Sequence, residues 1–315
     1  MKPIVKPIIA VVGGFLGAGK TTLILTASRL LQQRGLRPAA ILNDQGGDLV
    51  DTHYASAMGI ECDQVTGGCF CCRFPDLVDA AGRLLEFQPD VIFAEAVGSC
   101  TDIVATTLRP LLREHRGRFD VAPLTVVLHP RGRFDDPDLD FLYRNQIAEA
   151  DIHFARGESV QSWLDKILSG AIPAGVKTLD IDYTRYAAAE AALAWLNVRA
   201  TAHATPPISA PMLIGPLLDR LEPQIRIVHL KLFMQSDAGY LKAALTGNGQ
   251  DPMVEGALDA SPSQRHDILL NVRALDDPDA LRAIVEREFD AIPARIEWQH
   301  VECFRPSPPV PYHRA

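Results

Sequence analysis

The sequence has 315 residues, of which 47% are hydrophobic and 22% charged, a composition that excludes disordered, collagen-like and coiled-coil proteins. At roughly 150 residues per domain, this length predicts two domains, which we place at residues 1–185 and 186–315. The net charge of −8 makes nucleic acid and anionic lipid membranes poor partners, so we expect small molecules, metals or proteins instead.

No segment of the sequence is predicted to span a membrane. The longest apolar stretch, residues 7–19, contains one Pro and four Gly and is shorter than the ~20 residues that a membrane-spanning helix needs. Six cysteines in a chain of this length are too few for a disulfide scaffold. We therefore expect reduced thiols and a cytoplasmic location.

Between residues 7 and 182, short apolar runs alternate with amphipathic stretches, which is typical of an α/β fold with a mostly parallel sheet. Strands that lack charge and lie between helices are buried on both faces. The predicted strands are Ile8–Gly13, Pro38–Asn43, Val91–Glu95, Leu124–His129, Ile152–Ala155 and Val176–Ile181. The predicted helices are Lys20–Arg34, Phe74–Phe87, Ile103–Glu114, Asp138–Ala150 and Ser159–Leu168.

The pattern changes near Tyr186 and predicts a smaller α+β domain. Its elements follow the order β-α-β-β-α-β, which is the ferredoxin-like arrangement. They are a strand around residues 193–198, the helix Ile208–Leu221, the strand Ile225–Met234, the strand Asp267–Arg273, the helix Pro278–Phe289 and the strand Arg295–Phe304. A long Gly-rich and Pro-rich excursion over 236–263 is predicted to contain one helix, Ala238–Leu245.

Residues 14–21, Gly-Phe-Leu-Gly-Ala-Gly-Lys-Thr, match the phosphate-loop pattern G-x-x-x-x-G-K-[ST] between a predicted strand and a predicted helix. Backbone N–H groups at the start of the helix favour phosphate, Lys20 would reach the β- and γ-phosphates, and Thr21 would bind Mg²⁺. The residues expected to hold the nucleotide here are Gly14, Gly17, Ala18, Gly19, Lys20, Thr21 and Thr22.

A carboxylate that holds Mg²⁺ or its water is expected at the end of another central strand. Glu95 ends the apolar run Val91–Glu95, and Gly98 follows three residues later, where its backbone could approach a γ-phosphate. Taken with the phosphate loop, this pattern predicts that Thr21 and Glu95 share the Mg²⁺ site.

Three thiols lie within four positions at Cys69, Cys71 and Cys72, after two glycines that let the loop turn sharply. Thiolates so spaced suit a soft or borderline ion such as Zn²⁺ or Co²⁺. The alternative is a set of buried thiols without a ligand. Three ligands leave a fourth position open, for which the candidates are Glu61, Cys62 and Cys100.

These motifs together resemble the CobW-like P-loop GTPases, which are related to the maturation GTPases HypB and UreG. The resemblance rests on residues 14–22, on Asn43-Asp44-Gln45-Gly46 with Asp51 beyond it, on Gly68-Cys69-Phe70-Cys71-Cys72 and on Glu95-Ala96-Val97-Gly98. It covers about the first 160 residues. It implies a P-loop G domain, slow GTP hydrolysis that also involves Asp44 and Asp51, and delivery of a metal or assembly of a metal cofactor.

The sequence departs from the family pattern at three places. Asp44 replaces a Glu, and His129-Pro130 follows a strand that usually ends in Asp. The guanine-reading Lys-x-Asp motif is replaced by Arg156-Gly157-Glu158. Glu158 could still accept hydrogen bonds from guanine while Arg156 stacks on the base, or the two residues could form a surface ion pair.

Three functions are compatible with these features. The first is a GTP-dependent metallochaperone that carries Zn²⁺ or Co²⁺ to a client metalloenzyme. The second is a nucleotide-dependent switch for a cobalamin- or corrinoid-dependent enzyme, in which the cysteines are structural. The third is an ATP-using kinase or ligase with redox cysteines. The expected partners are GTP and GDP with Mg²⁺ and a client protein, and a homodimer is a further option.

Overall fold

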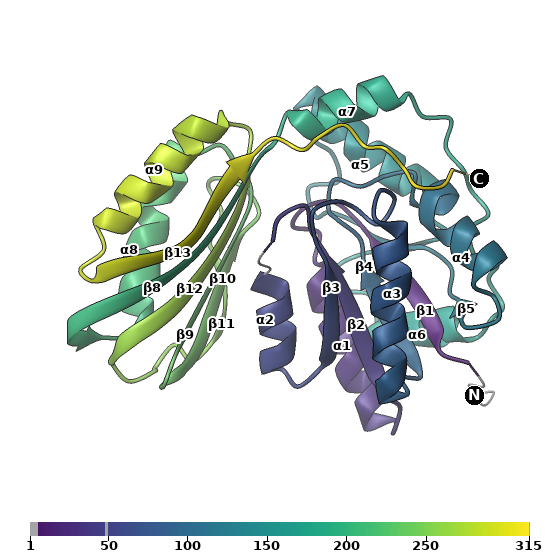
Figure 1. Ribbon diagram of the computed structural model, residues 1–315, viewed down its shortest axis with the longest axis horizontal. Helices are drawn as coiled ribbons and strands as arrows, with labels where there is room; N and C mark the ends of the chain where they lie inside the picture. Colours follow the sequence, from purple (N-terminus) through teal and green to yellow (C-terminus); the bar gives the residue numbers. More distant parts are fainter. Residues whose placement is uncertain (1–5, 48–49, 315) are drawn as a thin grey trace. The chain divides into compact units, whose positions relative to one another are not determined.

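The computed structural model describes residues 6–47 and 50–314, which divide into two compact units (Figure 1). Within these ranges, the first unit contains residues 6–45, 51–190 and 308–314, and the second contains 46–47, 50 and 191–307. The tail that begins at Pro308 therefore belongs to the first unit. In the part of the chain so described, no helix is both long enough and apolar enough to cross a membrane.

A parallel sheet forms the centre of the first unit, with the strand order β3-β2-β4-β1-β6-β7 and with β5 paired to β1. Its strands are β1 (Ile8–Gly13), β2 (Pro38–Asn43), β3 (Glu61–Val65), β4 (Val91–Glu95), β5 (Asp120–Val121), β6 (Thr125–Val127) and β7 (Ile152–Phe154). Because all of these pairs are parallel, the carboxyl ends of β1, β2 and β4 meet at one edge of the sheet. The loops at that edge contain every motif singled out above.

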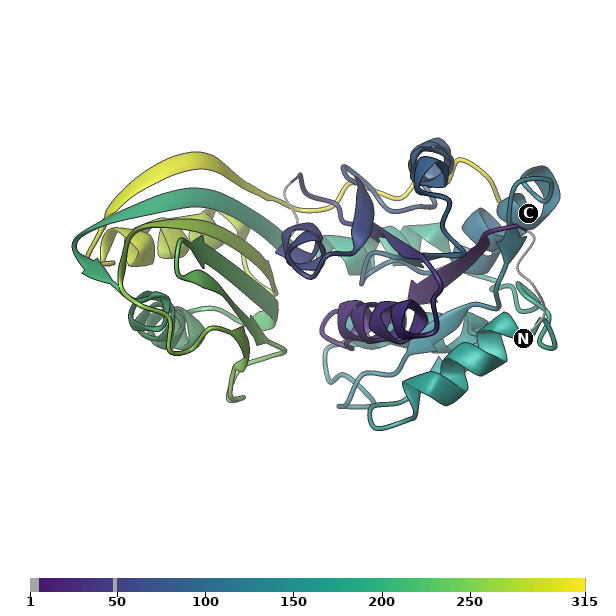
Figure 2. The same cartoon turned by 90° about the horizontal axis from the view of Figure 1, so that it is seen from below.

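Helices cover both faces of this sheet, with α1 and α6 on one face and α3 and α4 on the other (Figure 2). Trp163 of α6 stacks on Phe93 of β4, and its indole N–H donates to the Thr125 hydroxyl at 3.0 Å. The helical segments are α1 (Lys20–Gln33), α2 (Val50–Ala57), α3 (Phe74–Leu84), η1 (Leu85–Phe87), the π-helical η2 (Val104–Leu108), α4 (Arg109–Glu114), α5 (Pro137–Glu149), α6 (Val160–Leu168) and α7 (Tyr183–Ala191).

The second unit is an antiparallel sheet with the strand order β11-β10-β9-β12-β8-β13 and two helices. Its elements are β8 (Ala194–Ile208), α8 (Ala210–Leu221), η3 (Glu222–Gln224), β9 (Ile227–Ser236), β10 (Gly239–Leu245), β11 (Met253–Gly256), β12 (Ser263–Ala274), α9 (Pro278–Asp290) and β13 (Arg295–Phe304). The order β8-α8-β9-β12-α9-β13 is the expected β-α-β-β-α-β order, with β10 and β11 inserted after β9.

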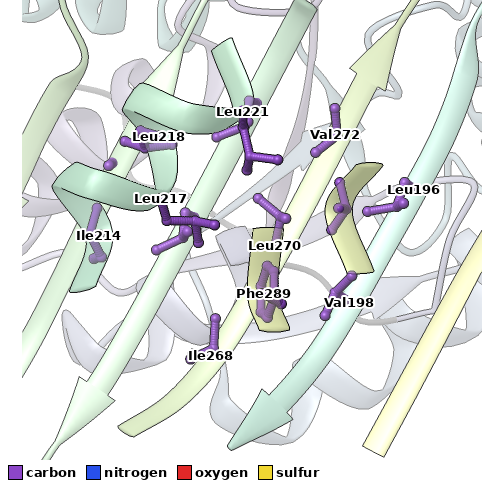
Figure 3. Close-up of a cluster of buried hydrophobic side chains, with 14 of the residues drawn as sticks. Leu196, Val198, Ile214, Leu217, Leu218, Leu221, Ile268, Leu270, Val272 and Phe289 are labelled. Atoms are coloured by element: carbon purple, nitrogen blue, oxygen red, sulfur yellow. The ribbon is translucent and has the colours of Figure 1, made fainter. Parts of the chain in front are cut away.

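The core of this unit lies between the sheet and its two helices (Figure 3). Leu217 and Leu221 of α8 and Phe289 of α9 are fully buried against the sheet. Leu270 and Val272 of β12 meet them from the sheet side. Residues two apart along β12 share this face, which explains the alternation in its sequence.

The structure confirms the mostly parallel sheet of the first unit and the separate second sheet. The predicted strands Ile8–Gly13, Pro38–Asn43 and Val91–Glu95 have the same bounds in the structure. Sequence reasoning missed α2 and β3. The missed strand β3 has the sequence Glu-Cys-Asp-Gln-Val and ends the sheet next to β2, so its polar side chains hid it from a search for apolar runs.

Two predicted elements are wrong. Residues 176–181 form no strand; just before and at the start of this segment, the Asp151 carboxylate accepts from the backbone N–H groups of Gly175 and Val176, at 2.8 and 3.2 Å. The segment predicted as a helix over 238–245 is instead the strand β10. Leu241, Ala243 and Leu245 all face the core, a spacing of two that suits a strand and not a helix.

We predict that Leu270→Ala lowers the free energy of unfolding of the second unit by about 2–5 kcal/mol, because it leaves a cavity in the centre of a closely packed core. Urea unfolding followed by tryptophan fluorescence measures the change. Leu258, which is 63% exposed, provides the control variant Leu258→Ala, which should stay within about 0.5 kcal/mol of the parent. Equal effects of the two substitutions would contradict this assignment of the core.

Candidate functional site

The phosphate-loop residues 14–21 connect β1 directly to α1, as expected. Gly14 has a φ of +136°, and a Cβ there would lie 2.6 Å from the Val127 carbonyl oxygen of β6, so only glycine fits. The Lys20 side chain lies along the loop, where its ammonium donates to the carbonyl oxygens of Gly14 at 2.8 Å and Phe15 at 3.4 Å. The lysine is thus held within the loop whose backbone N–H groups are expected to bind phosphate.

Thr21 and Glu95 meet beside this loop, although 74 residues separate them in sequence. The Thr21 hydroxyl donates to Glu95 Oε1 at 3.1 Å, and both side chains are buried. One hydroxyl and one carboxylate, both oxygen ligands, are therefore adjacent at the carboxyl ends of β1 and β4. Such a pair suits Mg²⁺, which prefers oxygen ligands.

His129 lies on the same side of the domain, next to the lysine. Burial, together with the charges of Arg131 and Lys20, lowers the pKa of His129 to about 4. The imidazole is therefore neutral at pH 7 and adds no positive charge beside Lys20. This explains how a histidine is accommodated where the family pattern has Asp.

Gly98, which follows Glu95, lies directly against the phosphate loop. A Cβ on Gly98 would lie 3.0 Å from the Leu16 backbone nitrogen and 2.6 Å from a Leu16 methyl carbon. The Gly98 carbonyl accepts from the buried Gln146 amide at 2.9 Å, and the same amide donates to the Cys100 carbonyl at 3.0 Å. The segment after β4 is therefore fixed against the phosphate loop on one side and against α5 on the other.

The cysteine motif forms the turn between β3 and α3. The backbone N–H groups of Cys72 and Arg73 both donate to the Cys69 carbonyl, at 3.0 and 2.9 Å. The sulfurs of Cys69, Cys71 and Cys72 all lie within 4.8 Å of one another, and Cys72 is the more accessible of the three. The expected cluster of three sulfurs is therefore present.

Asn43 holds this loop from the end of β2. Its amide N–H donates to the carbonyl oxygens of Val65 at 2.9 Å and Gly68 at 2.7 Å, and its carbonyl oxygen accepts from the Phe70 N–H at 2.9 Å. The side chain is buried, so these three bonds are shielded from water. One residue thus ties the end of β2 to the cysteine loop.

Two sulfurs of the cluster, those of Cys69 and Cys71, lie close enough to pair as a disulfide, while Cys62, Cys72, Cys100 and Cys303 are free. Because the thiolate is the form of cysteine that binds metal, this pair has to be reduced before all three residues can act as ligands.

The three candidates for a fourth ligand lie in different places. Glu61 is exposed, and the Cys62 sulfur lies 3.2 Å from the Ser56 hydroxyl and 3.8 Å from the Thr52 carbonyl oxygen, both in α2. The Cys100 sulfur lies 4.0 Å from the Cys71 sulfur and is fully buried. Among the described contacts of the three candidates, only the Cys100 sulfur therefore touches the cluster.

Two buried carboxylates stabilise the segment that contains Cys100. Glu149 accepts from the Val104 N–H at 3.0 Å and from the Thr101 hydroxyl at 3.3 Å, and burial raises the pKa of Glu149 to about 8. Glu190 accepts from the Ser99 hydroxyl at 2.6 Å and the Gln45 amide at 3.2 Å, and burial raises its pKa to about 7. Both side chains therefore bind a proton far more readily than exposed glutamates do.

The chain's tail lies over the cysteine loop. The Tyr312 N–H donates to the Cys71 carbonyl at 2.8 Å. Burial raises the pKa of the Cys72 thiol, and a backbone hydrogen bond from Val310 offsets part of this rise. Arg314 pairs with the buried Asp102 carboxylate at 3.0 Å, which fixes the end of the tail. Residues 308–314 thus partly cover Cys72.

The other predicted site residues lie at the same edge of the sheet or beyond it. Asp44 follows β2 and Asp51 lies in the first turn of α2, while residues 48–49 between them lie outside the described residues. Arg156 and Glu158 are exposed on the loop after β7, and no ion pair between them is found within residues 6–47 and 50–314. Thr22 is exposed on α1. The roles of these residues remain predictions.

Comparison with known proteins bears directly on this arrangement. Residues 8–154 match the model of the CobW/HypB/UreG nucleotide-binding domain. Over this stretch, slightly less than half of the chain, the sequence is similar to the nucleotide-binding domain of that family. The match covers the phosphate loop, the cysteine motif and the segment after β4, and it ends in β7.

Curated relatives of this CobW/HypB/UreG domain include zinc chaperones. The zinc chaperone YjiA of Escherichia coli K12 is 37% identical over 91 residues, or 28% of each chain. The zinc chaperone CobW of Pseudomonas aeruginosa PAO1 is 27% identical over 186 residues, or 48% of this chain and 49% of that protein. The matched parts thus span at most about half the length of these relatives.

Among solved structures, Zn(II)-bound YjiA GTPase from E. coli aligns over 91% of this chain and 99% of that chain, with 14% identity. The TM-score of 0.34 is too low to support any conclusion about this chain.

Sequence reasoning missed Asn43 as a clamp and missed the three buried acids Asp102, Glu149 and Glu190. Glu190 is the one charged residue in the Ala-rich run from 187 to 194, but a lone Glu is more often exposed to solvent, so the sequence does not indicate its burial. Nothing local in the sequence indicates the environment of Asp102, because its partners Tyr183 and Arg314 come from distant segments.

We predict that Glu149→Gln weakens the pH dependence of folding stability. The folded protein holds the Glu149 proton up to about pH 8, whereas the unfolded chain releases it near pH 4.5. The contribution of Glu149 to the free energy of unfolding is therefore complete below pH 4.5. It is lost as the pH rises to 8, by at most ~1.4 kcal/mol per pH unit. Gln resembles the protonated form and removes this loss.

Urea unfolding at pH 5, 6.5 and 8 measures the effect. The parent should lose stability over this range, and Glu149→Gln should lose less, with the remaining slope due in part to Glu190. Glu86→Gln, at an exposed glutamate, should retain the parent's slope. Identical slopes for the parent and Glu149→Gln would show that Glu149 is ionised in the folded protein.

Proposed function

We propose that this protein binds GTP with Mg²⁺, hydrolyses it slowly, and uses the nucleotide state to control the binding and release of Zn²⁺ or Co²⁺ at Cys69, Cys71 and Cys72. The observation that carries the proposal is the position of the thiol cluster. Asn43 holds it from the end of β2, and the segment after Glu95 touches it from the end of β4. Both ends belong to the nucleotide-binding edge of the sheet.

In this proposal, the phosphate loop and its neighbours perform the nucleotide chemistry. The backbone N–H groups of residues 14–19 bind the phosphates, and Lys20 leaves its carbonyl partners to neutralise the β- and γ-oxygens. Thr21 and Glu95 hold Mg²⁺ or its water, since they already lie 3.1 Å apart. Asp44, which follows β2, and Asp51, in the first turn of α2, act as carboxylates that orient the attacking water.

Guanine is the proposed base, on the strength of the CobW/HypB/UreG match. Glu158 would accept from the guanine N1 and N2 groups while Arg156 stacks on the ring. Both side chains are exposed on the loop after β7 and are accessible to a nucleotide. Parallel titrations with GTP and ATP in the presence of Mg²⁺ test this choice directly.

The donor set at the cysteine loop suits Zn²⁺ and Co²⁺. With Zn–S distances of ~2.3 Å, the sulfurs of a tetrahedral site lie ~3.8 Å apart. The Cys69–Cys72 and Cys71–Cys72 sulfur separations are both 3.6 Å, close to this value, whereas the sulfurs of Cys69 and Cys71 have to move apart once they are reduced. The metal is cargo in this proposal, and a client metalloprotein or corrinoid protein would receive it.

Replacing Lys20 by Ala should lower GTP hydrolysis by about 10²–10³-fold, since it removes a charge that stabilises the transition state. Phosphate release under saturating Mg²⁺-GTP measures the rate. Lys166→Ala, at an exposed position on α6, is the matched control and should leave the rate unchanged. Undiminished hydrolysis in Lys20→Ala would refute the assignment of the phosphate loop.

The reduced protein should bind about one Zn²⁺ with release of protons, because each thiol ionises when it binds metal. Cys72→Ser should lower the affinity at least about tenfold. Cys62→Ser provides a matched control, because Cys62 is also partly buried but lies beside α2. If both variants retain full affinity, the cluster does not bind zinc, and a structural role for the cysteines takes its place.

A further inference from the structure

We propose that Cys100 supplies the fourth sulfur of the metal site, so that the metal is bound by one cysteine from the segment after β4 and by three from the loop after β3. This inference rests on the proposed metal-binding function and identifies a ligand for the position that the Cys-x-Cys-Cys motif leaves open. The observation behind it is the 4.0 Å separation between the Cys100 and Cys71 sulfurs.

That separation fits a tetrahedral ion. An edge of a zinc tetrathiolate measures ~3.8 Å, from Zn–S distances of ~2.3 Å. The three separations Cys69–Cys72, Cys71–Cys72 and Cys71–Cys100 are 3.6, 3.6 and 4.0 Å. These three separations are close to the edges of such a site, although the sulfurs come from two segments about 30 residues apart.

The backbone around Cys100 is fixed before any metal binds. The Cys100 N–H donates to the Val97 carbonyl at 3.0 Å, and its own carbonyl accepts from Gln146 at 3.0 Å. The next N–H, that of Thr101, donates to the Tyr186 hydroxyl at 3.2 Å. The thiol is therefore presented on a rigid support, which a ligand requires to hold its position.

The other candidate ligands are less suitable. The Cys62 sulfur contacts Ser56 and Thr52 of α2 and not the cluster, and Glu61 is exposed on the same strand. Within the described ranges, Cys100 is the one further cysteine whose sulfur is in contact with the cluster.

A fourth ligand on the segment after β4 gives the site two forms. With Cys100 bound, the ion has four sulfurs and is closed to other ligands, as in structural zinc sites. Displacement of the Cys100 sulfur would leave the ion with three sulfurs and an open position that a client can occupy. On binding, four thiols lose one proton each, so that one divalent ion and four thiolates form a site of net charge −2.

Cobalt titration of the protein, reduced with a phosphine, tests the assignment. The wild type and Cys62→Ser should show the same near-ultraviolet thiolate-to-cobalt band. Cys100→Ser should lose about a quarter of its intensity and bind at least about tenfold more weakly. A full band in a correctly folded Cys100→Ser would overturn the role of Cys100 but leave the three-cysteine site intact. Absence of any thiolate band in the wild type would overturn both proposals.

Because Cys100 is buried, its substitution can disturb folding, and a measurement on the unaltered protein is also required. Zinc X-ray absorption of the wild-type protein counts the ligand atoms. Four sulfurs at ~2.3 Å are expected. Three sulfurs with one oxygen or nitrogen would exclude Cys100 as a ligand.

Discussion

The close approach of Gly98 to the phosphate loop is the constraint on which the arrangement of this site depends. A single added carbon atom would lie 3.0 Å from the Leu16 backbone nitrogen, closer than real Cβ contacts normally allow. Because that space is filled, the segment after β4 cannot move toward the phosphate loop. If the phosphate loop changes its conformation when it binds phosphate, it therefore either displaces Gly98 or is held in place by the contact with Gly98.

The side chains that hold the segment after β4 in place are buried away from water. Gln146 binds two of its carbonyls, Glu149 binds the start of η2, and Glu190 binds Ser99. A carboxylate away from water is costly unless it is hydrogen-bonded or protonated, and here both conditions contribute. The cysteine loop is anchored in the same manner by Asn43. Asn43 and the segment after β4 thus both connect the nucleotide edge of the sheet to the thiols.

Much of this could be predicted from the sequence where the signal is local. The phosphate loop, the apolar strands and the cysteine triplet are each contiguous, and each was located by pattern and spacing. The sequence does not reveal the strand β3 because its residues are polar, and the prediction of a helix over β10 is wrong because its apolar residues alternate with a period of two. The polar sequence of β3 has no apolar period, and the period of two in β10 extends over only three core residues.

The parts of the site that could not be predicted are formed by residues distant in sequence. Asp102 is enclosed by Tyr183 and by Arg314, which are 81 and 212 residues away. Cys100 meets Cys71 only because β4 and the β3–α3 turn end at the same edge of the sheet. Such long-range contacts depend on the order of the strands in the sheet, and this order cannot be inferred from the pattern of a single sequence.

The most direct test of the coupling between nucleotide and metal is the zinc affinity of the reduced protein in two nucleotide states. The Kd for Zn²⁺ should differ by at least about fivefold between Mg²⁺ with a non-hydrolysable GTP analogue and Mg²⁺-GDP. By thermodynamic reciprocity, zinc must shift the ratio of the affinities for the two nucleotides by the same factor. Equal zinc affinities in the two states would contradict the coupling, even if both ligands bind tightly.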